Sequence, residues 1–149
     1  MTRPVRLAVR AVILHEDRLL LVNAWPGGKS DLLCAPGGGV EPHEALPDTV
    51  RREVMEETGL TVSVGPPVLV NEFHDPNGDF HQVDIYFRCT LLCADIPDDW
   101  TDPEGVVVER HWVTRDEMGS LKIKPDSLAE VVWDHTGDAL YDPLEPLLR

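Results

Sequence analysis

The stretch from Gly38 to Leu60 constrains the fold more than any other part of the chain. Pro47 suits the first turn of a helix, where a missing N–H has no consequence. Gly59 suits the position just after a helix, where a positive φ is usual. The apolar residues between them recur at intervals of four and form one stripe: Leu46, Val50 and Val54. We therefore predict one helix within residues 42–59, with this stripe facing the core.

Glu53, Glu56 and Glu57 also belong to this predicted helix. At about 100° per residue they fall on one face of it. Like charges three and four residues apart destabilise a helix, so either a cation binds them or they form a solvated face. Mg²⁺ prefers oxygen ligands and shares its coordination sphere with substrate phosphates. A bound cation would also draw a diphosphate toward an otherwise negative protein.

The residues around these glutamates repeat a known spacing. The Nudix box is G-x5-E-x7-R-E-U-x-E-E-x-G-U, where U is a bulky aliphatic residue. The sequence from Gly38 to Leu60 fits this pattern at every fixed position, with Glu44 and Arg52 at the two flanking charged positions. The segment 35–41 before the box and a late strand ending at Trp112-Val113 are also similar to Nudix domains. The chain thus resembles the Nudix family.

This resemblance implies an α+β fold in which a mixed β-sheet is sandwiched between helices. It also implies hydrolysis of a nucleoside diphosphate linked to another moiety, with Mg²⁺ or Mn²⁺ as the cofactor. The expected metal ligands are the side chains of Glu53, Glu56 and Glu57 and the carbonyl group of Gly37. Arg52 would orient the glutamates by salt bridging, Glu44 would support that network, and Gly38 and Gly59 would shape the box.

The proton acceptor for the attacking water has two candidates. Glu57 is one, because it belongs to the metal-binding set, and Glu53 and Arg52 complete the catalytic group of the box. Glu104 is the other, since it precedes Trp112 at a position where some Nudix enzymes place an extra glutamate, and it could also bind a metal. The alternative for Glu104 is plain solvation, because its loop also holds other acidic residues: Asp98, Asp99 and Asp102.

The rest of the chain is rich in β-prone segments. We expect strands at residues 7–13, 18–22, 32–35, 61–70, 83–92 and 106–113, with the fourth interrupted by Gly65-Pro66-Pro67. A short helical turn is expected at 116–118, a second helix at 125–133 and an irregular tail from about residue 134. A length of 149 residues suits one domain, so residues 1–149 are predicted to form a single Nudix domain.

The composition favours a small-molecule partner. The formal net charge is −14, which repels polyanions and argues against nucleic acid as a partner. The three cysteines form no C-x-x-C pair, and we find neither a signal peptide nor an apolar run long enough to span a membrane. We therefore expect a cytoplasmic protein that does not bind membranes. Homodimers are frequent in the resembled family, although the sequence shows no interface signature.

The substrate depends on features outside the box. Many ADP-ribose pyrophosphatases have a proline at a set distance beyond the box, and Pro76 occupies that position. ADP-ribose or a related nucleotide sugar therefore ranks first, ahead of a nucleoside or deoxynucleoside triphosphate, with an RNA cap third because of the negative charge. An alternative of another class is a sensor domain that binds nucleotides without cleaving them. The complete set of glutamates argues against that alternative.

A few residues outside the box are candidates for substrate contact. Lys29, at a loop tip, could reach a phosphate, although a surface role is the alternative. Phe73 could stack on a base, as could Trp25 and Phe80, although loop aromatics often anchor the loop itself. The histidines at positions 74, 81 and 111 have no metal-ligand spacing, and we expect them to be structural or exposed.

Overall fold

A computed structural model describes residues 3–93 and 99–148 of the chain. Its strands are β1 (Arg6–His15), β2 (Arg18–Asn23), β3 (Leu33–Cys34), β4 (Gly37–Gly39), β5 (Val62–His74), β6 (His81–Leu91), β7 (Arg110–Thr114), β8 (Leu140–Tyr141) and β9 (Glu145–Pro146). Its helical segments are η1 (Pro26–Gly28), α1 (Leu46–Thr58), α2 (Arg115–Met118) and η2 (Glu130–Asp134).

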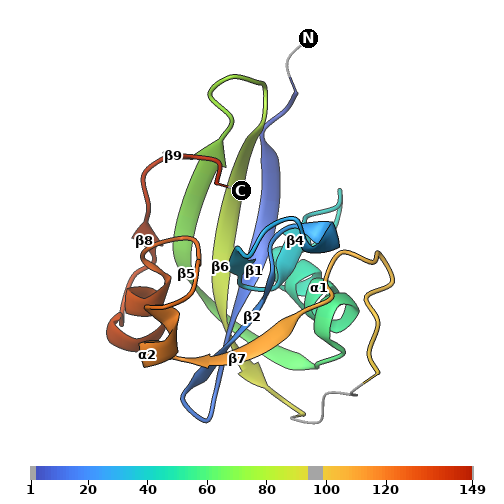
Figure 1. The fold of residues 1–149 in the computed structure, drawn as a ribbon, viewed down its shortest axis with the longest axis vertical. Coiled ribbons are helices and arrows are strands. Elements are labelled where there is room, and N and C mark those ends of the chain that lie inside the picture. Colours follow the sequence, from blue (N-terminus) through green and yellow to red (C-terminus); the bar gives the residue numbers. More distant parts are fainter. Residues whose placement is uncertain (1–2, 94–98, 149) are drawn as a thin grey trace.

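The described strands form one mixed sheet in the order β3-β2-β1-β6-β5-β8 (Figure 1). β1 and β6 pair in parallel over eight residue pairs, from Arg6–Gln82 to Ile13–Cys89. β4 pairs antiparallel with the beginning of β1, and β7 pairs antiparallel with β2. The parallel pairing brings residues that are far apart in the sequence side by side at the centre of the sheet.

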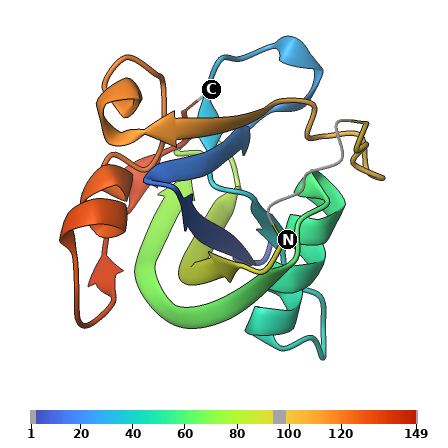
Figure 2. The ribbon, with the colours of Figure 1, turned by 90° about the horizontal axis from the view of Figure 1, so that it is seen from below.

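The sheet buries both of its faces. Along β1, Val9, Ala11 and Ile13 pack in one core cluster with Val50 and Val54 of α1. The alternate residue Val12 packs in a second cluster on the opposite face, together with the η2 residues Val131 and Val132. Figure 2 shows α1 and the C-terminal helical segments on opposite sides of the sheet. The predicted α+β class and the sheet between helices are confirmed.

The predicted interruption at Gly65-Pro66-Pro67 is an irregularity within one long strand. β5 continues through it, and its register against β6 shifts between Val64 and Pro67 and again between Pro67 and Leu69. Prolines lack the N–H that a regular ladder needs, and a bulge accommodates them. The prediction of an irregular tail from about residue 134 is wrong in part, because β8 and β9 pair in parallel with β5.

The first two predicted helical segments agree with the structure, and the third differs in its bounds. α1 lies within the predicted range, has Pro47 in its first turn and ends at Gly59 with φ of 75°. The predicted turn at 116–118 is α2, which Thr114 caps. The second helix, predicted at 125–133, is shorter than expected: it is the π-helical segment η2 (Glu130–Asp134), and the His135 N–H at its end donates to Glu130 O (2.9 Å). Within residues 3–93 and 99–148, no helix is long and apolar enough to cross a membrane.

Candidate active site

The guanidinium of Arg52 connects three carboxylates of the box. Its Nε and Nη2 donate to the two oxygens of Glu44, each at 2.9 Å. Its Nη1 donates to Glu53 Oε1 at 3.0 Å and to Glu56 Oε1 at 3.4 Å. A bidentate fork of this kind fixes direction as well as charge. Arg52 therefore holds two carboxylates of the helix face in place, as its predicted orienting role requires.

Glu44 ties this network to the loop before α1. Its Oε1 also accepts a hydrogen bond from Thr49 Oγ1 (2.7 Å), and the Arg52 hydrogen bonds followed by that of Thr49 lower the pKa of Glu44 to about 2. Arg52 Nη2 also donates to Gly39 O at 3.3 Å. The arginine thus spans from the helix to the glycine-rich strand β4.

Glu57 is directed toward that same glycine-rich strand. Its Oε1 accepts from the Gly37 N–H at 2.9 Å. Burial raises the pKa of Glu57 to about 8, against the opposing effects of the Arg10 charge and the Gly37 hydrogen bond. Burial also raises the pKa of Glu53, and the neighbouring charge of Glu56 adds to that rise. Each of these buried carboxylates would be stabilised in its charged form by a nearby cation.

The second glycine of the run is held close to a carboxylate. A Cβ on Gly38 would lie 2.5 Å from Cδ of Glu53, and 2.6 Å and 2.7 Å from its two carboxylate oxygens. A Cβ at this position would displace the Glu53 carboxylate that Arg52 holds, so glycine lets the loop approach the helix without moving that group. The pattern G-x5-E-x7-RE has a direct steric cause here.

The donor set fits a hard divalent cation. Glu56 Oε2 is buried and has no hydrogen-bond partner among the described residues. Together with Glu53 and Glu57 it supplies carboxylate oxygens from one rigid helix, the ligand type that Mg²⁺ prefers. In the described part of the chain, no three acidic, histidine or cysteine side chains converge in metal-binding geometry.

The loop that carries Glu104 lies against this cluster. Asp102, only 4% exposed, accepts hydrogen bonds from the backbone N–H groups of Glu104 and Val107, both at 2.9 Å. The charge of Glu104 contributes to the raised pKa of Glu53. Residues 94–98 lie outside the described residues, and with them the first part of the predicted acidic loop, including Asp98.

Two side chains attach this segment to the end of α1. Trp100 Nε1 donates to Glu56 O (2.9 Å), and Arg110 Nε donates to Glu57 O (2.7 Å). The indole also packs on Gly59, where an added Cβ would lie 2.8 Å from Trp100 Cδ2. The sequence analysis missed both residues, because no local pattern relates them to the helix.

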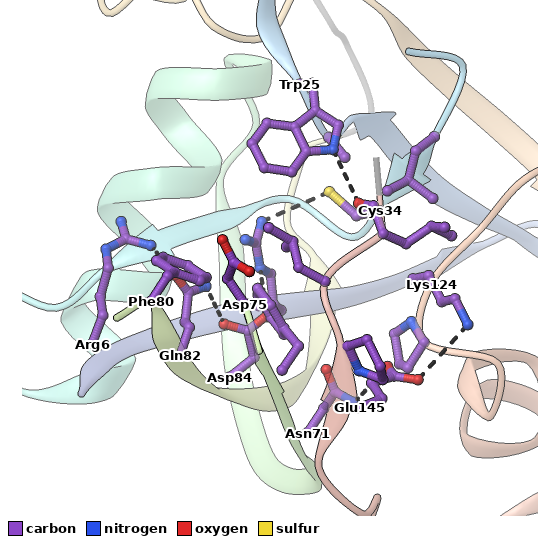
Figure 3. Close-up of a pocket in the computed structure, with 18 of the residues that line it drawn as sticks. Arg6, Trp25, Cys34, Asn71, Asp75, Phe80, Gln82, Asp84, Lys124 and Glu145 are labelled. Atoms are coloured by element: carbon purple, nitrogen blue, oxygen red, sulfur yellow. Dashed lines mark hydrogen bonds and ion pairs between the residues drawn. The ribbon is translucent and has the colours of Figure 1, made fainter. Parts of the chain in front are cut away.

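The predicted substrate-contact residues do not all meet. Phe73 lines a cavity of about 630 Å³ together with Trp25 and Phe80, and Figure 3 shows the latter two. Pro76 lies in the turn that borders this cavity. Lys29 lines a separate hollow of about 480 Å³ with Glu109 and other residues. The structure therefore unites the three candidate aromatics and separates them from the candidate lysine.

The floor of the cavity lined by Phe73 is a polar chain that sequence patterns did not reveal. Arg6 donates to Gln82 Oε1, Gln82 donates to Asp84 Oδ1 at 2.7 Å, and Arg10 Nε donates to Asp84 Oδ2 at 3.3 Å. Both arginines also lie against the glycine-rich strand β4. A Cβ on Gly39 would lie 2.7 Å from Arg6 Nη2, and a Cβ on Gly37 would lie 2.9 Å from Arg10 Cδ. Cavity and carboxylate helix thus lie on the two sides of the β1–β4 pair.

A family model described as the NUDIX domain matches residues 4–133, which include the box, strands β1 to β7 and all but the last residue of η2. The chain belongs to the Nudix family. This Nudix chain is 30% identical over 115 residues to the mouse (Mus musculus) protein "Nucleoside diphosphate-linked moiety X motif 6", a match that covers 70% of this chain and 34% of that protein. It is 33% identical over 100 residues to rat (Rattus norvegicus) "Diphosphoinositol polyphosphate phosphohydrolase 2", covering 66% of this chain and 50% of that one.

Solved Nudix structures share the fold. A NUDIX hydrolase from Nitrosomonas europaea superimposes with a TM-score of 0.72 at 24% identity, covering 87% of this chain and 86% of that one. The Nudix chain described here spans about a third to a half of the length of the two curated relatives.

Proposed function

We propose that the chain hydrolyses a phosphoanhydride bond in a nucleoside diphosphate linked to another moiety, and that it uses Mg²⁺ or Mn²⁺. The observation that supports this most is the contact of the single Arg52 guanidinium with Glu44, Glu53 and Glu56. A merely solvated acidic face would need no such partly buried fork, and exposed ion pairs contribute little.

The residues that would hold the metal are Glu53, Glu56 and Glu57, with the carbonyl group of Gly37. When bound, the ion supplies Lewis-acid polarisation of the diphosphate and a lowered pKa of water. The chain's own part is to fix these carboxylates by Arg52 and to accept a proton from the attacking water. Glu57 and Glu104 are the candidate acceptors, and the position of Glu104 near Glu53 supports including it.

ADP-ribose or a related nucleotide sugar is the substrate we favour. Pro76 lies in the turn between β5 and β6, next to Asp75 and Gly78, which line the aromatic cavity. A nucleoside triphosphate cleaved to a monophosphate and pyrophosphate is the second candidate, because the same cavity and carboxylates could serve it. The names of the curated relatives add diphosphoinositol polyphosphates as a third class to be tested.

A substrate screen tests the proposal. The protein is incubated with ADP-ribose, UDP-sugars, nucleoside triphosphates and an inositol pyrophosphate, with Mg²⁺ or Mn²⁺, and products are read by mass. We expect metal-dependent cleavage of a nucleoside diphosphate derivative, loss of that turnover in Glu57→Gln, and retention of it in Glu16→Gln, whose side chain is 82% exposed. Binding without turnover across the panel would instead make the domain a sensor.

A further inference from the structure

The side chain of Asn23 is 4% exposed and makes four hydrogen bonds to backbone groups. Its Nδ2 donates to Val106 O at 2.8 Å and to Trp25 O at 3.0 Å. Its Oδ1 accepts from the N–H groups of Val108 and Glu109, at 2.9 Å and 3.0 Å. An asparagine amide offers two N–H donors and one oxygen with two lone pairs, so its whole hydrogen-bonding capacity is used here.

The place of Asn23 in the sheet explains these contacts. The pairing of β2 with β7 ends at Val22 and Arg110, so Asn23 is the first residue of β2 beyond that ladder. Asn23 also pairs with Leu33 of β3, which fixes its backbone. Its side chain therefore continues the contact where the backbone ladder ends, and it holds the chain that leads into β7.

A second buried side chain holds the loop of residues 99–109, called here the Glu104 loop. Asp102 is also 4% exposed, and it accepts from the N–H groups of Glu104 and Val107, both at 2.9 Å. Trp100 and Arg110 bind carbonyl groups in the last turn of α1, and Figure 1 shows the segment before β7 beside that helix. The loop is thus fixed to β2, to itself and to the helix of the box.

Glu104 owes its position to this backbone. Its side chain is exposed, and its charge contributes to the raised pKa of Glu53, which indicates that it lies near the box. A long exposed side chain on a loose backbone would be spread over many conformations. A displacement of about 1 Å at a reacting group can slow a reaction by about a hundredfold. The backbone contacts of the loop therefore matter for any chemistry that Glu104 performs.

We propose that Asn23 is a positioning residue for hydrolysis, because its four hydrogen bonds fix residues 106–109 and thereby hold Glu104 beside the box. Asn23 acts through Glu104 and not on the diphosphate itself. The proposal rests on the proposed function, in which Glu104 is a candidate proton acceptor. It assigns a role to a residue at the end of β2, which lies outside the Gly38–Leu60 box.

A double-mutant cycle in steady-state kinetics tests whether Asn23 works through Glu104. The substrate is the one that the screen identifies, with Mg²⁺ present. Glu104→Gln should lower kcat by about a hundredfold or more, the usual effect of losing a proton acceptor. Asn23→Ala should lower kcat at least about tenfold and change KM by less than about threefold. In the Glu104→Gln background, Asn23→Ala should change kcat by less than about twofold, because the group that it positions is already inactive.

Amide hydrogen exchange, followed by NMR without metal or substrate, reads the loop directly. Asn23→Ala removes the acceptor of the Val108 and Glu109 N–H groups, so their exchange should become at least about tenfold faster. Exchange in the paired strands β1 and β6 should not change. Ser127→Ala is the matched control, because it removes the Ser127 hydrogen bond to Asp142 (2.6 Å) in the segment before η2. It should alter neither kcat nor the exchange of the Glu104 loop.

Thermal unfolding checks that each variant folds. If Asn23→Ala does not fold, Asn23→Asp takes its place in the kinetic cycle, since it keeps the size of the side chain but loses both donors. The same kinetic pattern is expected for it.

The outcomes separate this proposal from the proposed function. An equal loss of kcat from the Asn23 variant in both backgrounds would show a general effect on the fold and would overturn the positioning role. An unchanged kcat in Glu104→Gln or in the Asn23 variant, or unchanged exchange at Val108 and Glu109, would overturn it as well. Absence of turnover in the wild type with every substrate would instead refute the proposed function, while faster exchange in Asn23→Ala would still support the hold of Asn23 on the loop.

Discussion

The contact between Gly59 and Trp100 allows a quantitative test of how the Glu104 loop is docked. In Gly59→Ala, a residue with a Cβ must adopt a left-handed backbone conformation, which costs about 1–2 kcal/mol. The new Cβ would also lie 2.8 Å from Trp100 Cδ2, and relieving such an overlap costs about 1–3 kcal/mol more. The free energy of unfolding should therefore fall by about 2–5 kcal/mol. In a Trp100→Ala background only the backbone contribution remains, so the same substitution should cost about 1–2 kcal/mol.

The assay is urea denaturation of the wild type, the two single variants and the double variant. The coupling energy from this cycle should be about 1–3 kcal/mol. An identical effect of Gly59→Ala in both backgrounds, within about 0.5 kcal/mol, would refute the steric argument. The Trp100→Ala single variant also loses the hydrogen bond to Glu56 O, a loss of about 1 kcal/mol.

Three further predictions concern the box. Arg52→Lys keeps the charge but loses the bidentate fork on Glu44, so kcat should fall at least tenfold in a folded protein, and an unchanged kcat would contradict the orienting role. Gly38→Ala would drive a methyl group into the Glu53 carboxylate, so turnover should drop below detection in a steady-state assay, whereas normal turnover would show that the loop can retreat. Mg²⁺ at a hundred times its dissociation constant should stabilise the fold by about 2.7 kcal/mol and raise Tm by about 5–10 °C, an increase that EDTA abolishes and that Glu53→Gln greatly reduces.

The sequence was sufficient for the box because its interactions are local. The helix from Leu46 to Thr58 follows from an apolar repeat and two end signals, and the spacing that aligns Arg52 with Glu53 and Glu56 lies within two turns. Gly38 could be related to Glu53 only through a known family pattern. The structure supplies the steric reason for it.

The cavity could not be predicted in the same way. Arg6 and Gln82 meet although they are far apart in the sequence, because β1 and β6 pair in parallel. Local periodicity indicates that a segment is a strand but not which strand it joins. The short strands β8 and β9 have no alternation of their own, and they exist because the long edge of β5 offers them hydrogen bonds.

The alternation along β1 has a consequence for how this chain can change. Even-numbered positions hold the two arginines of the cavity floor, and odd-numbered positions hold the residues beneath α1. Removing or inserting a single residue inside this strand would exchange the two sets, so that guanidinium groups would enter the apolar core and aliphatic side chains would line the cavity. Natural variation in length should therefore accumulate in the exposed Glu16-Asp17 turn and be absent from the strand itself.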